Sequence, residues 1–235
     1  MINEEIFPFL AGKGHIVSLV GGGGKTTLLY AMAEYCARHG WKTLVTTTTH
    51  ILQPDRAVWA QTDAQLSTLW NRGGYAVLGS EAANGKLTAP SPALLDRWLP
   101  HAEAVFIEAD GAKHLPCKVP AAHEPVLLPQ SDLVLAVAGL SALGRPLAEV
   151  CFRPEIACGL LAAEPDTLLT PQLLAAMLAS EWGGRKNVGK KQFYAVLNQA
   201  DTPDRQNLGR QTLAVLSRAY QVKGFMTAFQ EGERA

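Results

Sequence analysis

Short apolar runs of strand length alternate along the chain with longer stretches in which apolar residues recur at helical spacing. The first run is Ile16–Val20, and a glycine-rich break follows it. In residues 26–39, Leu29, Met32 and Cys36 then share one helical face. This order predicts a strand, a glycine loop and a helix at the start of the chain.

Five later runs are also predicted to be strands, and most of them are apolar throughout. They are Thr43–Thr47, Val105–Ile107, Leu133–Ala138, Phe193–Leu197 and Val222–Thr227. Continuous apolar runs are typical of parallel strands that are covered on both faces. Strands that alternate with helical segments therefore predict an α/β fold in three layers, with helices on both faces of a mostly parallel sheet.

Two stretches interrupt this alternation. Residues 56–100 contain the turn-like sequences Asn71-Arg72-Gly73-Gly74 and Asn84-Gly85, which predict a helix and then a hairpin at the sheet edge. Residues 141–190 are predicted to be helical, with Thr170 as a helix cap before Pro171. We expect a single domain over residues 1–235 with insertions at about 56–100 and 141–190.

Charge and composition exclude several classes of protein. Lys and Arg together number 21, as do Asp and Glu, so the net charge is +0 and we expect no nucleic-acid partner. No apolar stretch approaches the roughly 20 residues that a membrane-spanning helix needs. The acidic start, Met1-Ile2-Asn3-Glu4-Glu5, is unlike a secretory signal. We expect a cytoplasmic protein that does not bind membranes, with four reduced, structural cysteines.

The glycine-rich break carries the strongest chemical motif, Gly21-Gly22-Gly23-Gly24-Lys25-Thr26-Thr27. Glycines allow successive backbone N–H groups to approach phosphate oxygens, Lys25 would neutralise the β- and γ-phosphates, and the Thr26 hydroxyl would hold Mg²⁺. The usual spacing would place a glycine at Leu19, so this loop is a shorter form, related to that of amide-forming ligases. The motif predicts a P-loop NTPase-like domain that binds a nucleoside triphosphate with Mg²⁺.

A predicted strand ends in the acidic sequence Glu108-Ala109-Asp110-Gly111. In a P-loop fold this position lies beside the triphosphate, where a carboxylate holds Mg²⁺ or its waters. Both Glu108 and Asp110 are therefore candidates for catalysis with Lys25 and for metal binding with Thr26. The backbone N–H of Gly111 is a candidate donor to the γ-phosphate.

The predicted strand at residues 193–197 is followed by Asn198-Gln199-Ala200-Asp201, which resembles the guanine-reading motif of GTPases. A carboxylate at Asp201 would accept hydrogen bonds from guanine that adenine cannot donate. Gln199 stands where that motif has lysine, which weakens the match. GTP is therefore favoured over ATP, but ATP is not excluded. We expect Asn198 and Asp201 to contact the base.

Two polar segments have both a functional and a structural interpretation. Thr46 to His50 close a predicted strand, where the threonine hydroxyls would touch Mg²⁺ or phosphate, or would only stabilise the strand. His50 would be a base or a ligand, or an ordinary surface histidine. Basic residues between Glu181 and Lys191 are interpreted as a solvated surface loop or as a lid over phosphate. A third group follows the acidic strand and would receive a second substrate or only face solvent: Lys113, His114, Lys118, His123 and Glu124.

Several of these segments together resemble the YqeC family over nearly the whole chain. The most specific are Glu108-Ala109-Asp110-Gly111, His123-Glu124-Pro125 and Arg153-Pro154-Glu155, in combination with the glycine loop. The resemblance implies a P-loop NTPase that acts as an accessory factor in maturation of selenium-dependent molybdenum hydroxylases. A molybdenum hydroxylase or a cofactor-synthesis protein is accordingly the implied protein partner.

Three functions agree with these motifs. The first is a Mg²⁺-dependent NTPase, with GTP preferred, that drives a maturation step. The second is a kinase or ligase that acts on a small molecule. The third is a binding module that senses nucleotide without turnover.

Overall fold

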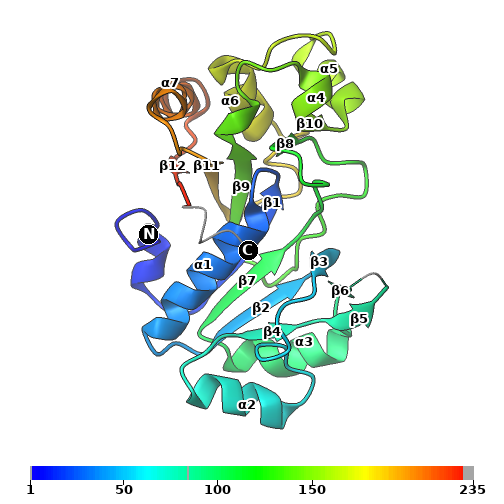
Figure 1. Ribbon diagram of the computed structural model, residues 1–235, viewed down its shortest axis with the longest axis vertical. Coiled ribbons are helices and arrows are strands. Elements are labelled where there is room, and N and C mark those ends of the chain that lie inside the picture. The colour runs from blue at the N-terminus through cyan, green and yellow to red at the C-terminus, as the bar shows by residue number, and fades with distance from the viewer. Residues whose placement is uncertain (1, 84, 230–235) are drawn as a thin grey trace.

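A seven-stranded parallel sheet forms the centre of the molecule, in the order β12-β11-β9-β1-β7-β2-β4 (Figure 1). The computed structural model describes residues 2–83 and 85–229. The strands of this sheet are β1 (His15–Gly21), β2 (Thr43–Thr47), β4 (Ala76–Leu78), β7 (Ala104–Glu108), β9 (Leu133–Gly139), β11 (Gln192–Asn198) and β12 (Gly224–Met226). Strand β1 lies in the middle and pairs with β7 on one side and β9 on the other.

The remaining elements are helices and two small sheets. The helices are α1 (Lys25–Arg38), α2 (Asp63–Asn71), α3 (Pro92–Trp98), α4 (Leu147–Val150), α5 (Pro154–Leu161), α6 (Pro171–Ala179) and α7 (Pro203–Tyr220), with the 3-10 turns η1 (Pro8–Ala11), η2 (Leu99–His101) and η3 (Leu140–Ala142). One small sheet is antiparallel, in the order β3-β6-β5, with bounds His50–Leu52, Lys86–Thr88 and Ser80–Ala82. The other pairs β8 (Cys117–Lys118) with β10 (Cys151–Phe152) in parallel.

Both faces of the central sheet are buried, which explains the continuous apolar runs. Along β9, Leu133, Leu135 and Val137 pack in the cluster that contains helix α1. The alternate residues of β9 pack on the other face, against α6. Further along that face, the β2 and β7 side chains are covered by α2 and α3. The predicted three-layer α/β arrangement is therefore confirmed.

All six strands expected from the apolar runs belong to the central sheet, and β2 has the predicted bounds. Residues 56–100 differ from the expectation, because β4 becomes the edge strand of that sheet and α3 follows the hairpin. Strand β4 has three residues, which is too short to show a periodicity. Residues 141–190 contain helices as expected, and the Thr170 hydroxyl accepts a hydrogen bond from the Leu173 N–H.

The loop from Glu181 to Lys191 lies mostly at the surface, and two of its lysines fasten it to the protein. Lys186 Nζ donates to the carbonyls of Ala121 and Ala122, and Lys191 Nζ donates to those of Pro129 and Ser131. Hydrogen bonds to the chain thus position Lys186 and Lys191, whereas Lys190 is exposed.

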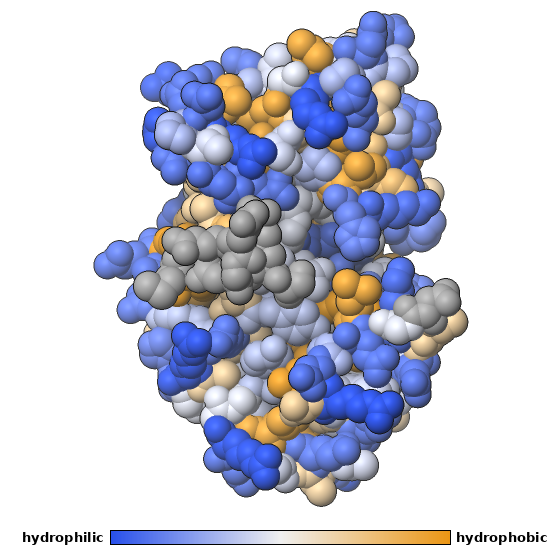
Figure 2. Space-filling model, in the orientation of Figure 1, coloured by the Kyte–Doolittle hydropathy of each residue, from blue (hydrophilic) through white to orange (hydrophobic). Residues whose placement is uncertain are grey.

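None of the helices described is both long enough and apolar enough to cross a membrane. On the face shown in Figure 2, hydrophilic residues predominate at both ends of the molecule, and the apolar patches between them are separate.

Candidate functional site

The glycine loop begins where β1 ends, at the centre of the carboxyl edge of the parallel sheet. Strand order reverses around β1, and ligands of open α/β sheets bind at such a point. Glycine is required here for two reasons. Gly21 and Gly23 have φ of +97° and +73°, which side chains disfavour. A Cβ would also lie 2.2 Å from Val137 O at Gly21 and 2.1 Å from Gly139 N at Gly23.

The first three loop amides donate to the protein itself. Gly21 N–H donates to both carboxylate oxygens of Asp110, Gly22 N–H to Val137 O at 2.9 Å, and Gly23 N–H to Leu115 O at 3.0 Å. Phosphate contacts were expected along the whole glycine run, and in this structure these three amides are already used. The first turn of α1 leaves its backbone N–H groups without intrahelical partners. Gly24 to Thr27 therefore supply the donors that face an anion.

The Lys25 side chain folds back over the glycine loop that precedes it. Its Nζ donates to Gly21 O at 2.5 Å and lies 3.2 Å from Asp110 Oδ1. The residue is only 4% exposed. A buried ammonium group is costly unless it is paired, so Asp110 compensates its charge in this structure.

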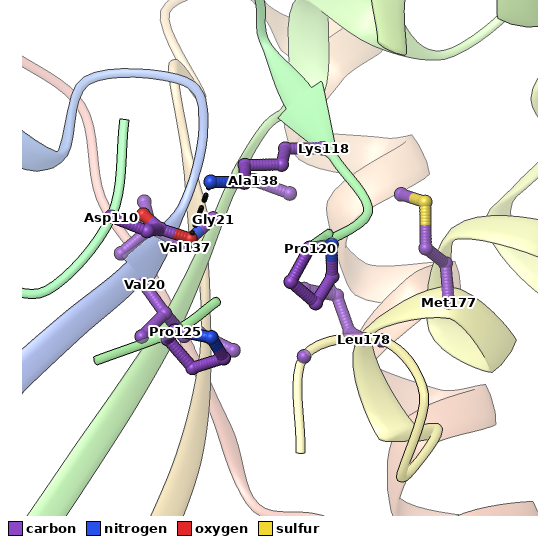
Figure 3. Close-up of a pocket in the computed structure, with 13 residues that line it drawn as sticks. Val20, Gly21, Asp110, Lys118, Pro120, Pro125, Val137, Ala138, Met177 and Leu178 are labelled. Carbon is purple, nitrogen blue, oxygen red and sulfur yellow. Dashed lines mark hydrogen bonds and ion pairs between the residues drawn. The ribbon is translucent and has the colours of Figure 1, made fainter. Parts of the chain in front are cut away.

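Lys25 belongs to a chain of ion pairs that we term the charged cluster, formed by Lys25, Asp110, Lys118, Glu124 and Arg153. Lys118 Nζ lies 3.1 Å from Asp110 Oδ2 and 2.8 Å from Glu124 Oε2, and Arg153 reaches the same Glu124 oxygen at 2.7 Å. Asp110 and Lys118 face one another in Figure 3. Three cations share two carboxylates, so the cluster has one positive charge in excess.

Sequence reasoning assigned no metal or catalytic role to Lys118, Glu124 or Arg153. Arg153 is distant in the chain from the other two, and Lys118 and Glu124 were placed only in a loop that would receive a substrate or face solvent. The sequence did single out His123-Glu124-Pro125 and Arg153-Pro154-Glu155, but only as segments that resemble the family. Only the folded chain shows that these charges meet beside the glycine loop.

Burial and ion pairing move the two neighbouring glutamate pKa values in opposite directions. Burial raises the pKa of Glu108 above 4.5, although Lys25 and the Thr26 hydroxyl oppose this change. Burial also raises the pKa of Glu124, but hydrogen bonds from Lys118 and Arg153 outweigh it and leave that pKa below 4.5. Glu124 is thus held as a carboxylate, whereas Glu108 is protonated more easily than an ordinary glutamate.

Thr26 and Glu108 form the pair of oxygen ligands best suited to Mg²⁺. Thr26 Oγ1 donates to Glu108 Oε2 at 2.7 Å, so the two oxygen atoms already converge. Hydroxyl and carboxylate oxygens are the ligands that Mg²⁺ prefers. Asp110 is less available to bind a metal ion, because both of its oxygens accept a hydrogen bond from Gly21 N–H and pair with lysines. These donors fit a magnesium ion beside the loop.

A small cavity of about 10 Å³ lies behind the loop (Figure 3). Asp110 and Lys118 face it from one side, and Met177 and Leu178 of α6 line the other. A volume of roughly this size holds one water molecule. It is far too small for a nucleotide.

A larger cavity of about 280 Å³ lies on the outer side of the loop. Its lining residues are Gly24, Thr27, Ser141, Asn198, Gln199, Asp201, Arg205 and Phe229. The expected base-reading segment therefore borders the first turn of α1. Asp201 Oδ2 lies 3.2 Å from Arg205 Nη1 at the entrance of helix α7.

The side-chain amide of Asn198 forms hydrogen bonds within the protein at both ends. Its Nδ2 donates to Gly23 O at 2.9 Å, and its Oδ1 accepts from Thr227 Oγ1 at 3.0 Å. The side chain is buried, and both ends of its amide are used within the protein. Asn198 thus ties the glycine loop to the chain after β12.

The threonines at the end of β2 and just after it mostly stabilise the backbone. The hydroxyls of Thr46, Thr47 and Thr48 donate to the carbonyls of Leu78, Glu108 and Val126. Thr49 differs, because its hydroxyl is buried and has no hydrogen-bond partner within residues 2–83 and 85–229. His50 is exposed on β3.

Basic side chains surround the Phe152 ring at the outer end of the charged cluster. Lys113 Nζ lies 5.1 Å from the ring centroid and Arg153 Cζ 4.3 Å. Lys113, His114 and Arg153 all have positive φ, between 48° and 67°. Non-glycine residues in this region are strained, and such strain is concentrated at functional sites. His123 is exposed in the same part of the chain.

Cysteine and histidine do not form a metal centre. Within the residues that the structure describes, no group of three or more His, Cys, Asp or Glu side chains is arranged to hold an ion. All four cysteines are free in this structure.

Comparison with known proteins agrees with the motifs. The family model described as YqeC protein matches residues 17–155, which include the glycine loop and the whole charged cluster. The Asn198 segment lies beyond this match. The chain is also 32% identical over 181 residues to the "Uncharacterized protein YqeC" of Escherichia coli (strain K12), an alignment that covers 74% of this chain and 71% of that protein. The chain therefore belongs to the YqeC family.

Proposed function

We propose that this protein is a Mg²⁺-dependent nucleoside triphosphate hydrolase that prefers GTP to ATP. The observation that carries the proposal is the position of Lys25, whose buried ammonium group lies over the glycine loop at the start of α1. In a P-loop site the same group contacts the β- and γ-phosphates. Asp110 provides the negative charge that phosphate oxygens would supply once nucleotide binds.

Lys118 allows this exchange of partners. When Lys25 turns towards phosphate, Asp110 keeps an ion pair with Lys118 at 3.1 Å and its hydrogen bonds from Gly21 N–H. Asp110 is therefore not left as an unpaired buried charge, which would be costly. The positive excess of the charged cluster also favours an incoming polyanion.

Thr26 and Glu108 would hold Mg²⁺ in this proposal, and Asp110 would hold the loop. The ion would neutralise charge on the phosphates. Glu108 must lose its proton to act as a ligand. Its raised pKa thus makes magnesium binding weaker at low pH.

The 280 Å³ cavity next to Thr27 would receive the base and ribose, with Asp201 accepting from guanine. Asn198 would act indirectly, since it positions Gly23. The role in maturation of a selenium-dependent molybdenum hydroxylase rests on the family resemblance. A molybdenum hydroxylase or a cofactor-synthesis protein is the proposed partner.

Thermal unfolding with GTP, ATP or CTP and Mg²⁺ tests nucleotide binding. A ligand at 100 times its Kd stabilises the native state by about 2.7 kcal/mol, which raises the Tm of a chain of this size by roughly 5–11 °C. We expect GTP to give the largest shift and Lys25→Ala to abolish it. Lys13→Ala is the matched control, since Lys13 is exposed and pairs with Glu103. No shift with any nucleotide would refute the proposal.

Base choice is tested separately with Asp201→Asn. The amide supplies a donor where xanthine has a carbonyl, so this variant should prefer xanthosine triphosphate to GTP. Asp204→Asn, at an exposed position in the first turn of α7, should retain the preference for GTP. An unchanged preference in the Asp201 variant would contradict guanine reading.

One observation favours phosphoryl transfer to a small anionic acceptor as a second candidate. Lys113 and Arg153 gather around Phe152 at the outer end of the charged cluster, where they would bind an acidic substrate. Single-turnover reactions with radiolabelled GTP and ATP separate the candidates. Free phosphate whose release rises with a client enzyme supports the hydrolase, and a labelled metabolite supports the kinase or ligase. Binding without Lys25-dependent cleavage indicates a nucleotide-sensing module.

A further inference from the structure

Two cysteines lie opposite one another in the small parallel sheet beside the charged cluster. Cys117 begins β8, Cys151 begins β10, and the two residues are direct partners in the strand register. Adjacent strands are roughly 4.8 Å apart, which falls within the Cα separations of about 4.4–6.8 Å that disulfides span. The residues are 0% and 1% exposed, so they share one buried environment.

The two thiols also interact with each other. A hydrogen bond with Cys151 and then burial raise the pKa of Cys117, whereas the same hydrogen bond lowers the pKa of Cys151 despite its burial. In the structure each thiol donates to a backbone carbonyl, Cys117 Sγ to Val150 O at 3.3 Å and Cys151 Sγ to Phe152 O at 3.6 Å. Two cysteines that face one another in a strand register are placed to form a disulfide once one of them is oxidised.

We propose that Cys117 and Cys151 form a reversible disulfide when the protein meets a hydroperoxide. Each thiol gives up one proton and one electron, and a bond forms between the two sulfur atoms. The O–O bond of the oxidant breaks as it accepts both electrons and both protons. Hydrogen peroxide is thereby reduced to two water molecules.

The disulfide would join the two chain segments that build the charged cluster. The next pair in the same register is Lys118 and Phe152, and Arg153 follows directly. The preceding segment contacts the glycine loop, because Gly23 N–H donates to Leu115 O. Oxidation therefore cross-links the supports of Lys118 and Arg153. The proposal does not depend on nucleotide binding.

The other two cysteines are internal controls. Cys36 is buried in α1 and packs in the cluster on the opposite face of the sheet. Cys158 in α5 is more exposed than the pair and lies near enough to Cys151 to raise its own pKa slightly, after burial and Glu164. A disulfide between Cys151 and Cys158 is thus the competing product.

The test is to treat the folded full-length protein with hydrogen peroxide, alkylate the remaining thiols and map the peptides by mass spectrometry. We expect a cross-linked pair of peptides that contains Cys117 and Cys151, is lighter by two hydrogen atoms than the two thiol peptides, and separates on reduction. Cys36→Ser and Cys158→Ser should retain this product, and Cys117→Ser and Cys151→Ser should lose it.

Closing the loop between residues 117 and 151 should raise the Tm by about 6 °C or more, and dithiothreitol should reverse the rise. Three results would overturn the proposal: alkylation of both thiols after prolonged oxidation, separate sulfinic acids on the two residues, or a link from Cys151 to Cys158. Mapping uses the wild-type chain, so the conclusion stands even where a serine variant does not fold.

Discussion

Replacing Lys118 by methionine tests whether the charged cluster is assembled as described. Lys118 is fully buried and its Nζ donates to Gly111 O at 2.6 Å, besides its ion pairs with Asp110 and Glu124. Methionine fills nearly the same space without a charge. Removing one member of a buried ion pair costs about 3–5 kcal/mol, because the remaining charge loses its partner.

We expect the lower end of that range for Lys118→Met. Asp110 keeps Lys25 at 3.2 Å, and Glu124 keeps Arg153 at 2.7 Å, so neither carboxylate becomes unpaired. A loss of about 3 kcal/mol corresponds to a Tm lower by roughly 6–12 °C for a chain of this length. Urea unfolding and calorimetry, each at neutral pH, measure the two quantities.

Two further variants make this experiment decisive. Lys113 lies in the same loop at an exposed position, so Lys113→Met should change the free energy of unfolding by no more than about 0.5 kcal/mol. Adding Asp110→Asn to Lys118→Met should cost less than the sum of the single changes, with a coupling of about 0.5–3 kcal/mol. If Lys118→Met unfolds at the wild-type urea midpoint, the buried ion pairs do not stabilise this fold and the reasoning is wrong.

Three other predictions follow from the loop and its neighbours. Gly23→Ala should cost more than about 2 kcal/mol in urea unfolding, because its Cβ would meet Gly139 N at 2.1 Å, whereas Gly40→Ala has similar φ and open space and should cost about 1 kcal/mol. The pKa of Glu124 is lowered, so the stability that this carboxylate contributes is complete above pH 4.5 and is lost as the pH falls through the folded-state pKa. Over that acidic range the Tm of Glu124→Gln should fall less steeply with pH than the Tm of the wild type. The pKa of Glu108 is raised, so the stability that its protonated form contributes is present below pH 4.5 and is lost as the pH rises through the folded-state pKa. The Tm of Glu108→Gln should not show this loss of stability in the same Tm profiles.

Local pattern was sufficient for much of the architecture. The apolar runs identified six strands of the central sheet, because strands covered on both faces must be apolar throughout. The glycine loop was recognisable since close backbone approach and positive φ both require glycine. Strand β4 and the pairing of β8 with β10 were missed, because elements of three and two residues carry no periodicity.

Roles within the site were harder to predict than its location. Nothing in the sequence indicated that the Asn198 amide joins Gly23 to Thr227, and its contact with a base stays a prediction. The sequence left Glu108 and Asp110 equal as magnesium ligands. Their hydrogen bonds distinguish them, since Glu108 meets Thr26 and Asp110 meets Gly21 N–H and two lysines.

The sequence by itself determined the α/β class, the position of the glycine loop and the family, because these depend on residues that are close together in the chain. Only the tertiary structure decided which charges pair. Lys25, Lys118 and Arg153 are separated by 93 and 35 positions, yet they share Asp110 and Glu124 within 3.2 Å. Ion pairing depends on distance in space, and packing around β1 and β8 sets that distance.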